Sequence, residues 1–541
     1  MFSHQDTKRK FFMVRKKIQV WLPLVFSIIM AVGIIIGYQL RAKTTGGNSF
    51  LQNDNSSPLQ QAISLIKNKY VDNVNMDSLE EPAINGLLDH LDPHSVYIPA
   101  QDLDAMNEDL QGNFQGIGIE FQIINDTVNV MNVIPDGPSF KAGVQIGDKI
   151  VSVNDTVNLA GKNVTTLDVR KQLRGAYGSN VIVGIVRNSA LKKIKIARGI
   201  IPLYSLDAAY MLDSITGYIK LNKFAETTYR EFMQAMEKLQ QQHMKQLLLD
   251  LRDNGGGIMQ QAVDIADEFL DEDKLIVYTQ GEHSPRSDYR CSKDGVFEKG
   301  KLVVLVDETS ASASEILAGA LQDWDRATII GRRTFGKGLV QQQFNLSDRS
   351  AIRLTVARYY TPLGRNIQKP YDKGREQYEE ELVNRFHDGE LVIGDTIKPK
   401  GQAFKTPAGH LVYGGGGITP DIFVAYDTTS QPRPVIELFA RGTIRNFVYN
   451  YYIEHRDQLQ QYKSPGQLLK QYTMGEPEWN QLQSFALKDS VDLGKVNDSA
   501  KHFVMQQMQN LLARQIWRTE GYYEFANSTD PMIKKAVEVL K

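Results

Sequence analysis

The sequence predicts a multidomain α/β and α+β protein with a helical C-terminal region and one N-terminal transmembrane helix. The chain has 541 residues, which is enough for several domains. After Leu203, buried apolar strands alternate with glycine turns and helices, a rhythm typical of a layered α/β core. Near the N-terminus, an uncharged stretch of 23 residues follows a basic cluster.

The uncharged stretch runs from Ile18 to Leu40. As a helix it would measure ~34 Å, enough to cross the apolar core of a bilayer. Basic residues that precede such a stretch stay in the cytoplasm; here they are Lys8, Arg9, Lys10, Arg15, Lys16 and Lys17. We therefore expect a cytoplasmic basic tail at 1–17 and a single-pass signal anchor at 18–40 in the inner (cytoplasmic) membrane, with the rest of the chain extracytoplasmic, in the periplasm. A cleaved signal peptide is the alternative.

Composition excludes several classes of function. The formal net charge of −1 gives no reason to expect a nucleic-acid partner. Cys291 is the single cysteine, which rules out an internal disulfide and a cysteine-built zinc site. The nine histidines are scattered, and no His-Glu-x-x-His helix occurs.

The spacing of apolar residues changes twice in the first half of the chain. Residues 41–57 are rich in Gly, Asn, Ser and Thr and are expected to be a linker. Residues 58–111 place apolar side chains near helical spacing, which predicts an N-terminal helical region. Between 112 and 190, short strands such as 181–186 surround one helix at 167–173.

This order of strands and one helix resembles a PDZ domain, expected at 112–190. The run 147–154, Gly-Asp-Lys-Ile-Val-Ser-Val-Asn, supports the resemblance. The loop of Gly116, Ile117, Gly118 and Ile119 sits where that family binds a carboxylate. Its successive N–H groups could hold a chain terminus while the bound peptide adds a strand to the sheet edge. An ordinary small β-domain is the alternative.

Three alternating serines, Ser310, Ser312 and Ser314, follow a buried apolar strand at 302–306. One of them could simply cap a helix, and Glu315 suits the first helical turn. Three exceed what one cap requires. A serine at a strand-to-helix turn is exposed, and the helix N-terminus helps to stabilise an oxyanion. The residues alone do not choose among the three.

Lys337 lies between Gly336 and Gly338. A neutral lysine amine can take the proton of a serine hydroxyl. Few lysines are neutral at pH 7 when the free pKa is ~10.4, so burial must lower the pKa of Lys337. Neighbours such as Phe335 and Leu339 could provide that burial. A solvated turn lysine is the alternative.

The same stretch offers a second alternative, a phosphate-binding P-loop. Gly331-x4-Gly336-Lys337 follows an apolar strand at 327–330. The motif then requires Ser or Thr and a helix. Here Gly338 takes the Ser/Thr position, and 339–344 has the pattern of a strand, which argues against a P-loop.

The glycine turn Gly255-Gly256-Gly257 joins a buried strand at 246–251 to a helix at 258–270. It could be only a tight turn. It could also offer backbone N–H groups to an oxyanion. No Gly-x-Ser-x-Gly elbow occurs in the chain, so a hydrolase triad of that type lacks its marker.

Together these motifs resemble the carboxy-terminal processing (tail-specific) protease family, serine–lysine peptidases with a PDZ domain. The resemblance covers about 58–421 and rests on the PDZ-like segment and on 250–257, 310–315 and 335–341. Residues 91–95 and 360–365 also look like that family's. The resemblance implies a peptidase core at 191–428 similar to the crotonase/Clp-protease fold, with no metal or cofactor. The helical C-terminal domain, 429–541, lies outside the shared core.

The resemblance also implies roles for individual residues. Ser312 matches the nucleophile, Lys337 the general base, and Gln341 the residue that orients the lysine. Ala313 and Gly257 match the backbone donors of the oxyanion hole.

Two further positions bear on the comparison with the family. Arg174, at the end of the PDZ helix, matches a regulatory arginine that couples substrate binding to assembly of the catalytic site in some members. A surface arginine is the alternative. Thr309 departs from the family, where a glycine often precedes the serine run.

The implied function is a serine endopeptidase that cleaves protein substrates near their C-terminus through an acyl-enzyme, with the PDZ domain capturing the substrate tail. Expected partners are proteins or peptides with apolar C-termini and the membrane, through 18–40. A homodimer is one option for assembly, since some members are dimers. The alternative function is a PDZ-bearing scaffold with an inactive peptidase core.

Overall fold

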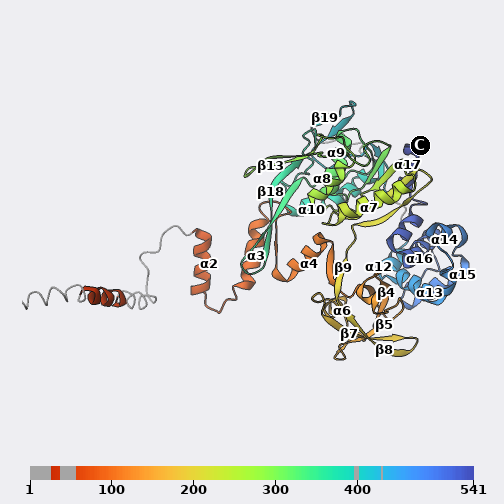
Figure 1. Cartoon of the computed structure of the whole chain (residues 1–541), viewed down its shortest axis with the longest axis horizontal. Helices are drawn as coiled ribbons and strands as arrows, with labels where there is room; N and C mark the ends of the chain where they lie inside the picture. The colour runs from red at the N-terminus through yellow and green to blue at the C-terminus, as the bar shows by residue number, and fades with distance from the viewer. Residues whose placement is uncertain (1–25, 37–56, 395–400, 428–430) are drawn as a thin grey trace, which may run out of the picture. The chain divides into compact units, whose positions relative to one another are not determined.

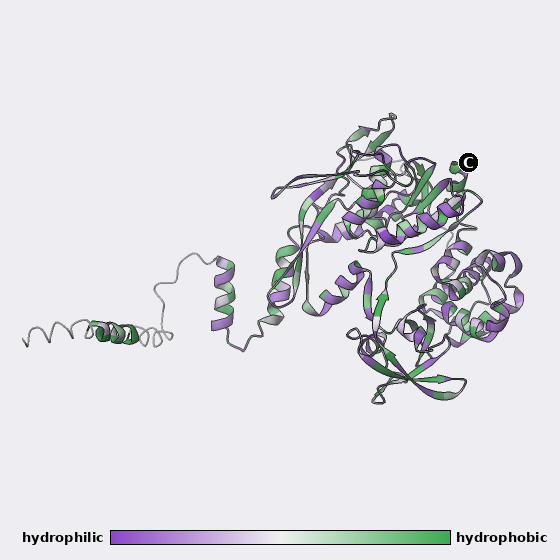
Figure 2. Cartoon of the chain, viewed as in Figure 1, coloured by the Kyte–Doolittle hydropathy of each residue, from purple (hydrophilic) through white to green (hydrophobic). Residues whose placement is uncertain are grey.

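The computed structural model describes residues 26–36, 57–394, 401–427 and 431–541. The chain divides into two compact units, 1–80 and 81–541. In the first unit, residues 26–36 form a helix of exposed, mainly hydrophobic side chains (Figure 2). Helix α2 (Pro58–Lys69) begins at a capping box in which Ser57 and Gln60 satisfy each other's backbone N–H.

The predicted transmembrane helix at 18–40 is wrong. Within the described ranges, no helix is long and apolar enough to cross a membrane. Of the predicted span, the structure describes residues 26–36, and these are helical with exposed side chains. The basic tail 1–17, the ends of the predicted span at 18–25 and 37–40, and the linker up to 56 lie outside the described residues.

The predicted helical region 58–111 contains a strand. Helix α3 (Asp77–Leu88) is followed by a turn, by β1 (Val96–Ile98) and by α4 (Ala100–Gln111). Strand β1 pairs antiparallel with β18 (Ala351–Tyr360), far along the chain. Helix α4 ends at Gly112, whose φ of 70° is the left-handed conformation that glycine adopts without strain.

The predicted PDZ region is a small antiparallel sheet with the order β3-β4-β5-β7-β8, which leaves β3 at an edge and extends past the predicted end at 190. Val128, Val153 and Val183 lie fully buried in its core. The short strands β2 and β9 pair with each other at the two ends of the region. Its elements are β2 (Asn113–Gly116), β3 (Ile119–Ile124), β4 (Thr127–Val133), α5 (Pro138–Lys141), β5 (Lys149–Val153), β6 (Val157–Asn158), α6 (Thr166–Leu173), β7 (Asn180–Arg187), β8 (Ala190–Ala197) and β9 (Gly199–Pro202).

The predicted peptidase core, 191–428, is built on a six-stranded sheet with the order β10-β11-β12-β15-β16-β21. Strands β10 and β11 are antiparallel and every later pair is parallel, as the buried apolar runs predict. The strands are β10 (Leu206–Met211), β11 (Thr216–Leu221), β12 (Gln246–Asp250), β15 (Leu302–Val306), β16 (Thr328–Gly331) and β21 (Ile422–Phe423).

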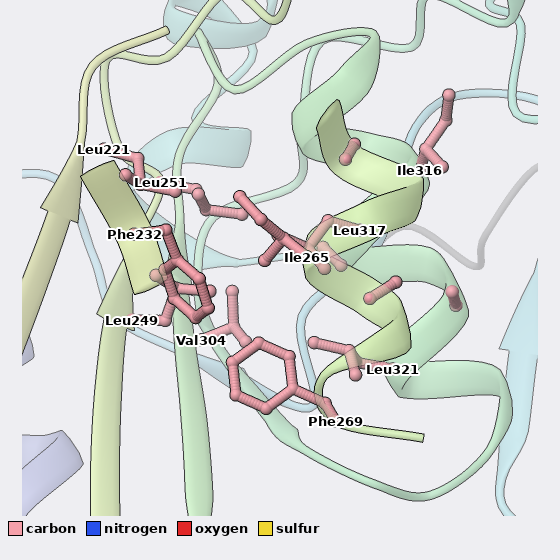
Figure 3. Packing of buried hydrophobic residues seen from close by; sticks show 14 of the residues in the cluster. Leu221, Phe232, Leu249, Leu251, Ile265, Phe269, Val304, Ile316, Leu317 and Leu321 are labelled. Carbon is pink, nitrogen blue, oxygen red and sulfur yellow. The ribbon is translucent and has the colours of Figure 1, made fainter. Parts of the chain in front are cut away.

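Helices cover both faces of this sheet. On one face, α7 (Thr228–Gln241), α8 (Met259–Asp267) and α9 (Ala313–Asp323) pack on it. Figure 3 shows Phe232, Ile265 and Leu317 of these helices meeting the strand residues Leu249 and Val304. On the other face, α17 (Pro531–Leu540) buries its own apolar stripe.

A second sheet carries part of the site. It has the order β1-β18-β13-β14, and β17 (Leu339–Asn345) also pairs antiparallel with β18. The two remaining strands are β13 (Leu275–Gly281) and β14 (Ser284–Arg290), and β13 and β18 lie side by side (Figure 1). The connections after β18 contain α10 (Arg375–His387), α11 (Glu390–Ile393), β19 (Ala403–Lys405) and β20 (Leu411–Tyr413).

The C-terminal region is helical, as its sequence pattern predicts. Its helices are α12 (Arg433–Ala440), α13 (Thr443–Leu459), α14 (Pro465–Gln471), α15 (Glu476–Lys488) and α16 (Asp498–Ala526). They bury a core of their own around Phe447, Trp479 and Leu512. Helix α16 kinks at Trp517 and Arg518 and contacts two neighbours. Arg518 pairs with Glu120 of β3, and the Tyr523 carbonyl accepts a hydrogen bond from the Tyr210 hydroxyl of β10.

Candidate active site

The turn between β15 and α9 separates the three candidate serines. The Ser310 hydroxyl donates to the Leu251 carbonyl at 2.8 Å, and the Ser314 hydroxyl donates to the Asn254 carbonyl at 2.9 Å. Both serines are fully buried. Ser312 is partly exposed, and its hydroxyl donates to no acceptor within the part of the chain that the structure describes. Of the three, Ser312 is therefore the one whose hydroxyl is free to react.

Ser312 also has a strained backbone. It is the N-cap of α9, with φ 56° and ψ −114°. A non-glycine residue in this region costs energy that the surrounding structure must supply, and such residues cluster at active sites. The strain is held by the preceding turn, where Asp307 Oδ1 accepts from the N–H groups of Thr309 and Ser310, each at 3.0 Å. Thr309 thus fills its position without disturbing Ser312.

Lys337 lies on the approach to β17, and its side chain is half-buried. Its Nζ donates to Oε1 of Gln341 at 2.9 Å. No carboxylate pairs with it among the described residues. Burial lowers the pKa of Lys337, and the positive charge of Arg353 lowers it further. Because 339–345 is the strand β17 and not a helix, the P-loop alternative also lacks its required element.

Two buried side chains join the backbones of Ser312 and Lys337. The Glu315 carboxylate accepts from the Ser312 N–H at 2.8 Å and from the Lys337 N–H at 2.9 Å. The Tyr359 hydroxyl contacts the Ser312 carbonyl at 3.1 Å and the Lys337 carbonyl. Burial raises the pKa of Glu315 to about 7 and raises the pKa of Tyr359 above its usual range. These bridges hold the serine turn and the lysine loop in one arrangement.

The glycine turn lies directly against Ser312. A Cβ added to Gly256 would stand 2.7 Å from Ser312 Cβ and 2.9 Å from the Ala313 nitrogen, so only glycine permits this approach. Asn254 fixes the turn, because its Oδ1 accepts from the Gly256 N–H at 2.9 Å. The N–H groups of Ala313 and Gly257 donate to no protein acceptor within the described ranges. Two unpaired donors beside a serine hydroxyl are the arrangement that an oxyanion requires.

A turn far from these loops in sequence completes the surroundings of Lys337. The Gln341 Nε2 donates to the His94 carbonyl. The His94 imidazole bonds to the Tyr378 hydroxyl at 2.7 Å. Burial and the positive charge of Lys337 lower the pKa of His94 to about 4.

Sequence reasoning assigned no site role to His94, Glu315 or Tyr359. Glu315 has a local signal, its place three residues after Ser312, but that place is equally typical of an ordinary first helical turn.

The predicted PDZ loop has two unpaired backbone donors within the described ranges. Ile117 and Gly118 join β2 to the edge strand β3, and their N–H groups donate to no protein acceptor among the described residues. Their carbonyls accept from Ser139 and Ile134 at 2.9 and 3.1 Å, which fixes the loop. No hydrogen bond or ion pair in the described part of the chain joins this loop to Ser312.

Arg174 is the C-cap of α6. Its guanidinium pairs with Glu108 of α4 at 2.5 Å and lies 4.5 Å from the centre of the Phe114 ring. It therefore sits where the PDZ region joins the N-terminal segment and makes no contact with Ser312. Within the described ranges, no group of three or more His, Cys, Asp or Glu side chains is placed to hold a metal ion.

Comparison with family models divides the chain in the same sequence of parts. Residues 215–377 match peptidase family S41, and 115–197 match the PDZ domain. Residues 39–102 match the N-terminal domain of the activating protease CtpB. Residues 435–518 match a family of unknown function.

Individual relatives are similar over more than half of the chain. The chain is 34% identical to the carboxy-terminal-processing protease of Bartonella bacilliformis over 61% of this chain and 76% of that protein. It is 32% identical to a CtpA-like serine protease of Staphylococcus epidermidis over 65% of this chain and 72% of that protein. A solved photosystem II D1 C-terminal processing protease is 30% identical, covers 58% of this chain and 84% of its own, and has a TM-score of 0.34. The resemblance seen in the motifs is confirmed: the chain belongs to the carboxy-terminal-processing proteases of peptidase family S41 and is a serine-type peptidase with a PDZ domain.

Proposed function

We propose that the chain cleaves proteins near their C-terminus by a serine–lysine mechanism. Ser312 Oγ attacks the peptide carbonyl, and Lys337 Nζ takes the hydroxyl proton and then gives it to the leaving amine. Water resolves the resulting acyl-enzyme, with Lys337 again as the base. The N–H groups of Ala313 and Gly257 stabilise the oxyanion in both steps.

One observation carries this proposal: Lys337 is a half-buried amine whose side chain meets an amide oxygen and, among the described residues, no carboxylate. An ion pair would hold a lysine in its charged form, whereas burial favours the neutral form that a base needs. Burial is the main reason that the pKa of Lys337 is lowered. The free hydroxyl of Ser312, on a backbone tied to that of Lys337 by Glu315, is the matching nucleophile.

We further propose that the PDZ domain captures the substrate tail. The loop of Gly116, Ile117, Gly118 and Ile119 would bind the terminal carboxylate, and the tail would pair with the free edge of β3. Arg174 would couple the binding of a tail to the assembly of the catalytic site in the peptidase core. Its pairing with Glu108 outside the PDZ region supports this role.

The cellular site of action is proposed as extracytoplasmic. The support is the basic cluster before an uncharged stretch, a pattern typical of segments that direct export. A reporter enzyme that works only outside the cytoplasm, fused after Ser57 in a bacterial host, tests it. Activity in the fusion is expected, and an inactive fusion that accumulates in the cytoplasm would contradict it.

Cleavage of an unfolded protein with an apolar C-terminus, by the full chain beside Ser312→Ala and Lys337→Ala, tests the mechanism. We expect cleavage by the wild type only, with the tail still bound by both variants. Full activity in Lys337→Ala would exclude the proposed base. Binding of the tail without cleavage by the wild type would favour a PDZ scaffold with an inactive core.

A further inference from the structure

A buried turn at 92–95 lies beside the proposed catalytic pair. Asp92 is 8% exposed and Ser95 is fully buried. The Asp92 Oδ1 accepts from the N–H groups of His94 at 2.8 Å and Ser95 at 2.9 Å, and Oδ2 accepts from the Ser95 hydroxyl at 2.6 Å. The shape of this turn therefore depends on one carboxylate.

The turn is bonded to β18 through Thr355. The Thr355 hydroxyl donates to Asp92 Oδ1 at 3.0 Å, and the Thr355 N–H donates to the Ser95 hydroxyl oxygen at 3.1 Å. Thr355 is also the partner of Gln341 in the pairing of β17 with β18, directly after an irregularity in the register. The same position of the sheet thus holds both the turn and Gln341.

The turn offers one acceptor to Gln341, the His94 carbonyl. A carbonyl can only accept, so the amide nitrogen Nε2 must face it. The amide oxygen Oε1 is then left to face Lys337, where it accepts from Nζ at 2.9 Å. A reversed amide would set two acceptors against each other and direct its NH2 group at the amine.

We propose that Asp92 is a positioning residue for Lys337, acting through the His94 carbonyl and the Gln341 amide. This inference rests on the proposed role of Lys337 as the base. Asp92 touches neither the substrate nor the reacting atoms. By shaping the turn it sets the direction of the His94 carbonyl, then of the amide, and then of the amine that must reach Ser312.

The test is steady-state cleavage of an unfolded protein with an apolar tail by the full chain carrying Asp92→Ala, Asp92→Asn or Asp89→Ala. Asp89 is the matched control, because it lies in the same segment but is exposed and pairs with Arg375 at 2.8 Å. We expect Asp92→Ala to lower kcat about 10- to 100-fold, the scale of a displaced general base, with KM changed less than about twofold. Asp92→Asn keeps an oxygen at the Oδ1 position and should stay within about threefold of the wild type, as should Asp89→Ala.

Unchanged kcat in folded Asp92→Ala overturns the proposal. An equal loss in Asp92→Asn, or in Asp89→Ala, also overturns it, because charge or the segment as a whole would then be responsible. If thermal unfolding shows that Asp92→Ala does not fold, Ser95→Ala decides. That variant removes one donor to Asp92, and we expect kcat to fall about 3- to 10-fold at unchanged KM; unchanged kcat overturns the proposal.

Lys337→Ala in the same assay distinguishes a failure of the proposed catalytic pair from a failure of the positioning role of Asp92. If Lys337→Ala stays fully active, the proposed catalytic pair fails. If Lys337→Ala is inactive while Asp92→Ala is fully active, only the positioning role fails.

Discussion

The buried carboxylate of Glu315 accepts a hydrogen bond from the backbone N–H of Lys337 at 2.9 Å. It also accepts from the Ser312 N–H at 2.8 Å, the Gly336 N–H at 2.8 Å and the Thr334 hydroxyl at 2.5 Å. Glu315 is fully buried, so no water can replace it for these donors. One side chain therefore sets the relative positions of the proposed nucleophile and the proposed base.

Glu315→Gln is expected to lose both stability and turnover, although glutamine has almost the same shape as glutamate. Each carboxylate oxygen of Glu315 accepts two donors, so the NH2 group of a glutamine must face two other donors. Leaving buried polar groups unpaired costs about 1–3 kcal/mol each, and we expect a loss of about 2–5 kcal/mol in the free energy of unfolding. Turnover should fall about 100-fold, the effect of a small displacement of catalytic groups. Denaturant unfolding and kcat/KM measure both. Glu272→Gln, at an exposed residue, is the control, and wild-type values for Glu315→Gln would contradict the bridging role.

The rate of cleavage is expected to rise with pH. Lys337 acts as a base only when neutral, and burial and Arg353 lower its pKa. Glu315, with its pKa raised to about 7 by burial, must be ionised to accept four donors, which shifts activity in the same direction. His94, with its pKa lowered to about 4, stays neutral and adds no step. We expect log(kcat/KM) to climb with pH and to level off below ~10.4, the pKa of a free lysine. A fall in kcat/KM between pH 6 and pH 9, at about constant stability, would contradict this assignment.

Lys337→Met should change how stability depends on pH. Because the pKa of Lys337 is lowered in the folded chain, the unfolded chain binds more protons between that pKa and ~10.4. The free energy of unfolding of the wild type therefore rises with pH across this window. Below the window Lys337 is charged in the folded chain, and the folded state bears the full cost of burying that charge. The methionine variant lacks this dependence, so its Tm relative to the wild type should be highest near neutral pH and should decline towards pH ~10. Thermal unfolding of both proteins over this range is the measurement, and parallel curves would contradict the lowered pKa.

Local patterns predicted much of the core and its loops. The apolar runs at 246–251 and 302–306 became β12 and β15, and the glycine turn and serine turn follow them as expected. Local patterns alone could not choose Ser312, which only the family resemblance singled out, because the acceptors that occupy Ser310 and Ser314 lie 59 and 60 residues away. The contact of His94 with Gln341 spans 247 residues. Such partners leave no periodic signal in the sequence. The transmembrane prediction was wrong, because no helix among the described residues is long and apolar enough to cross a membrane.

Gly256→Ala should remove activity, whereas Gly255→Ala should not. A Cβ at Gly256 would lie 2.6 Å from the Ala311 carbonyl oxygen, and its φ of 92° is strained for alanine. A Cβ at Gly255 meets nothing within 4 Å. We expect kcat to fall about 100-fold in Gly256→Ala, the scale for a lost oxyanion donor, because the turn that holds Gly257 must move. The matched Gly255→Ala should stay within about threefold of the wild type. Similar rates in the two variants would contradict the close packing of this turn on Ser312.

Arg518→Ala should loosen the PDZ edge strand without unfolding the chain. Arg518, at the kink of α16, pairs with Glu120 of β3 at 3.0 Å, and Arg514 stands 3.8 Å from the same carboxylate. Both pairs are partly exposed, so each contributes about 1 kcal/mol or less. Amide hydrogen exchange in β3 should quicken several-fold, and further in the double variant with Arg514→Ala, while the Tm changes by about 2 °C or less. Arg441→Ala is the control, since its guanidinium bonds to the Asp489 carbonyl inside the helical domain. Unchanged exchange in β3 for the double variant would show that the helical domain does not hold this strand through Glu120.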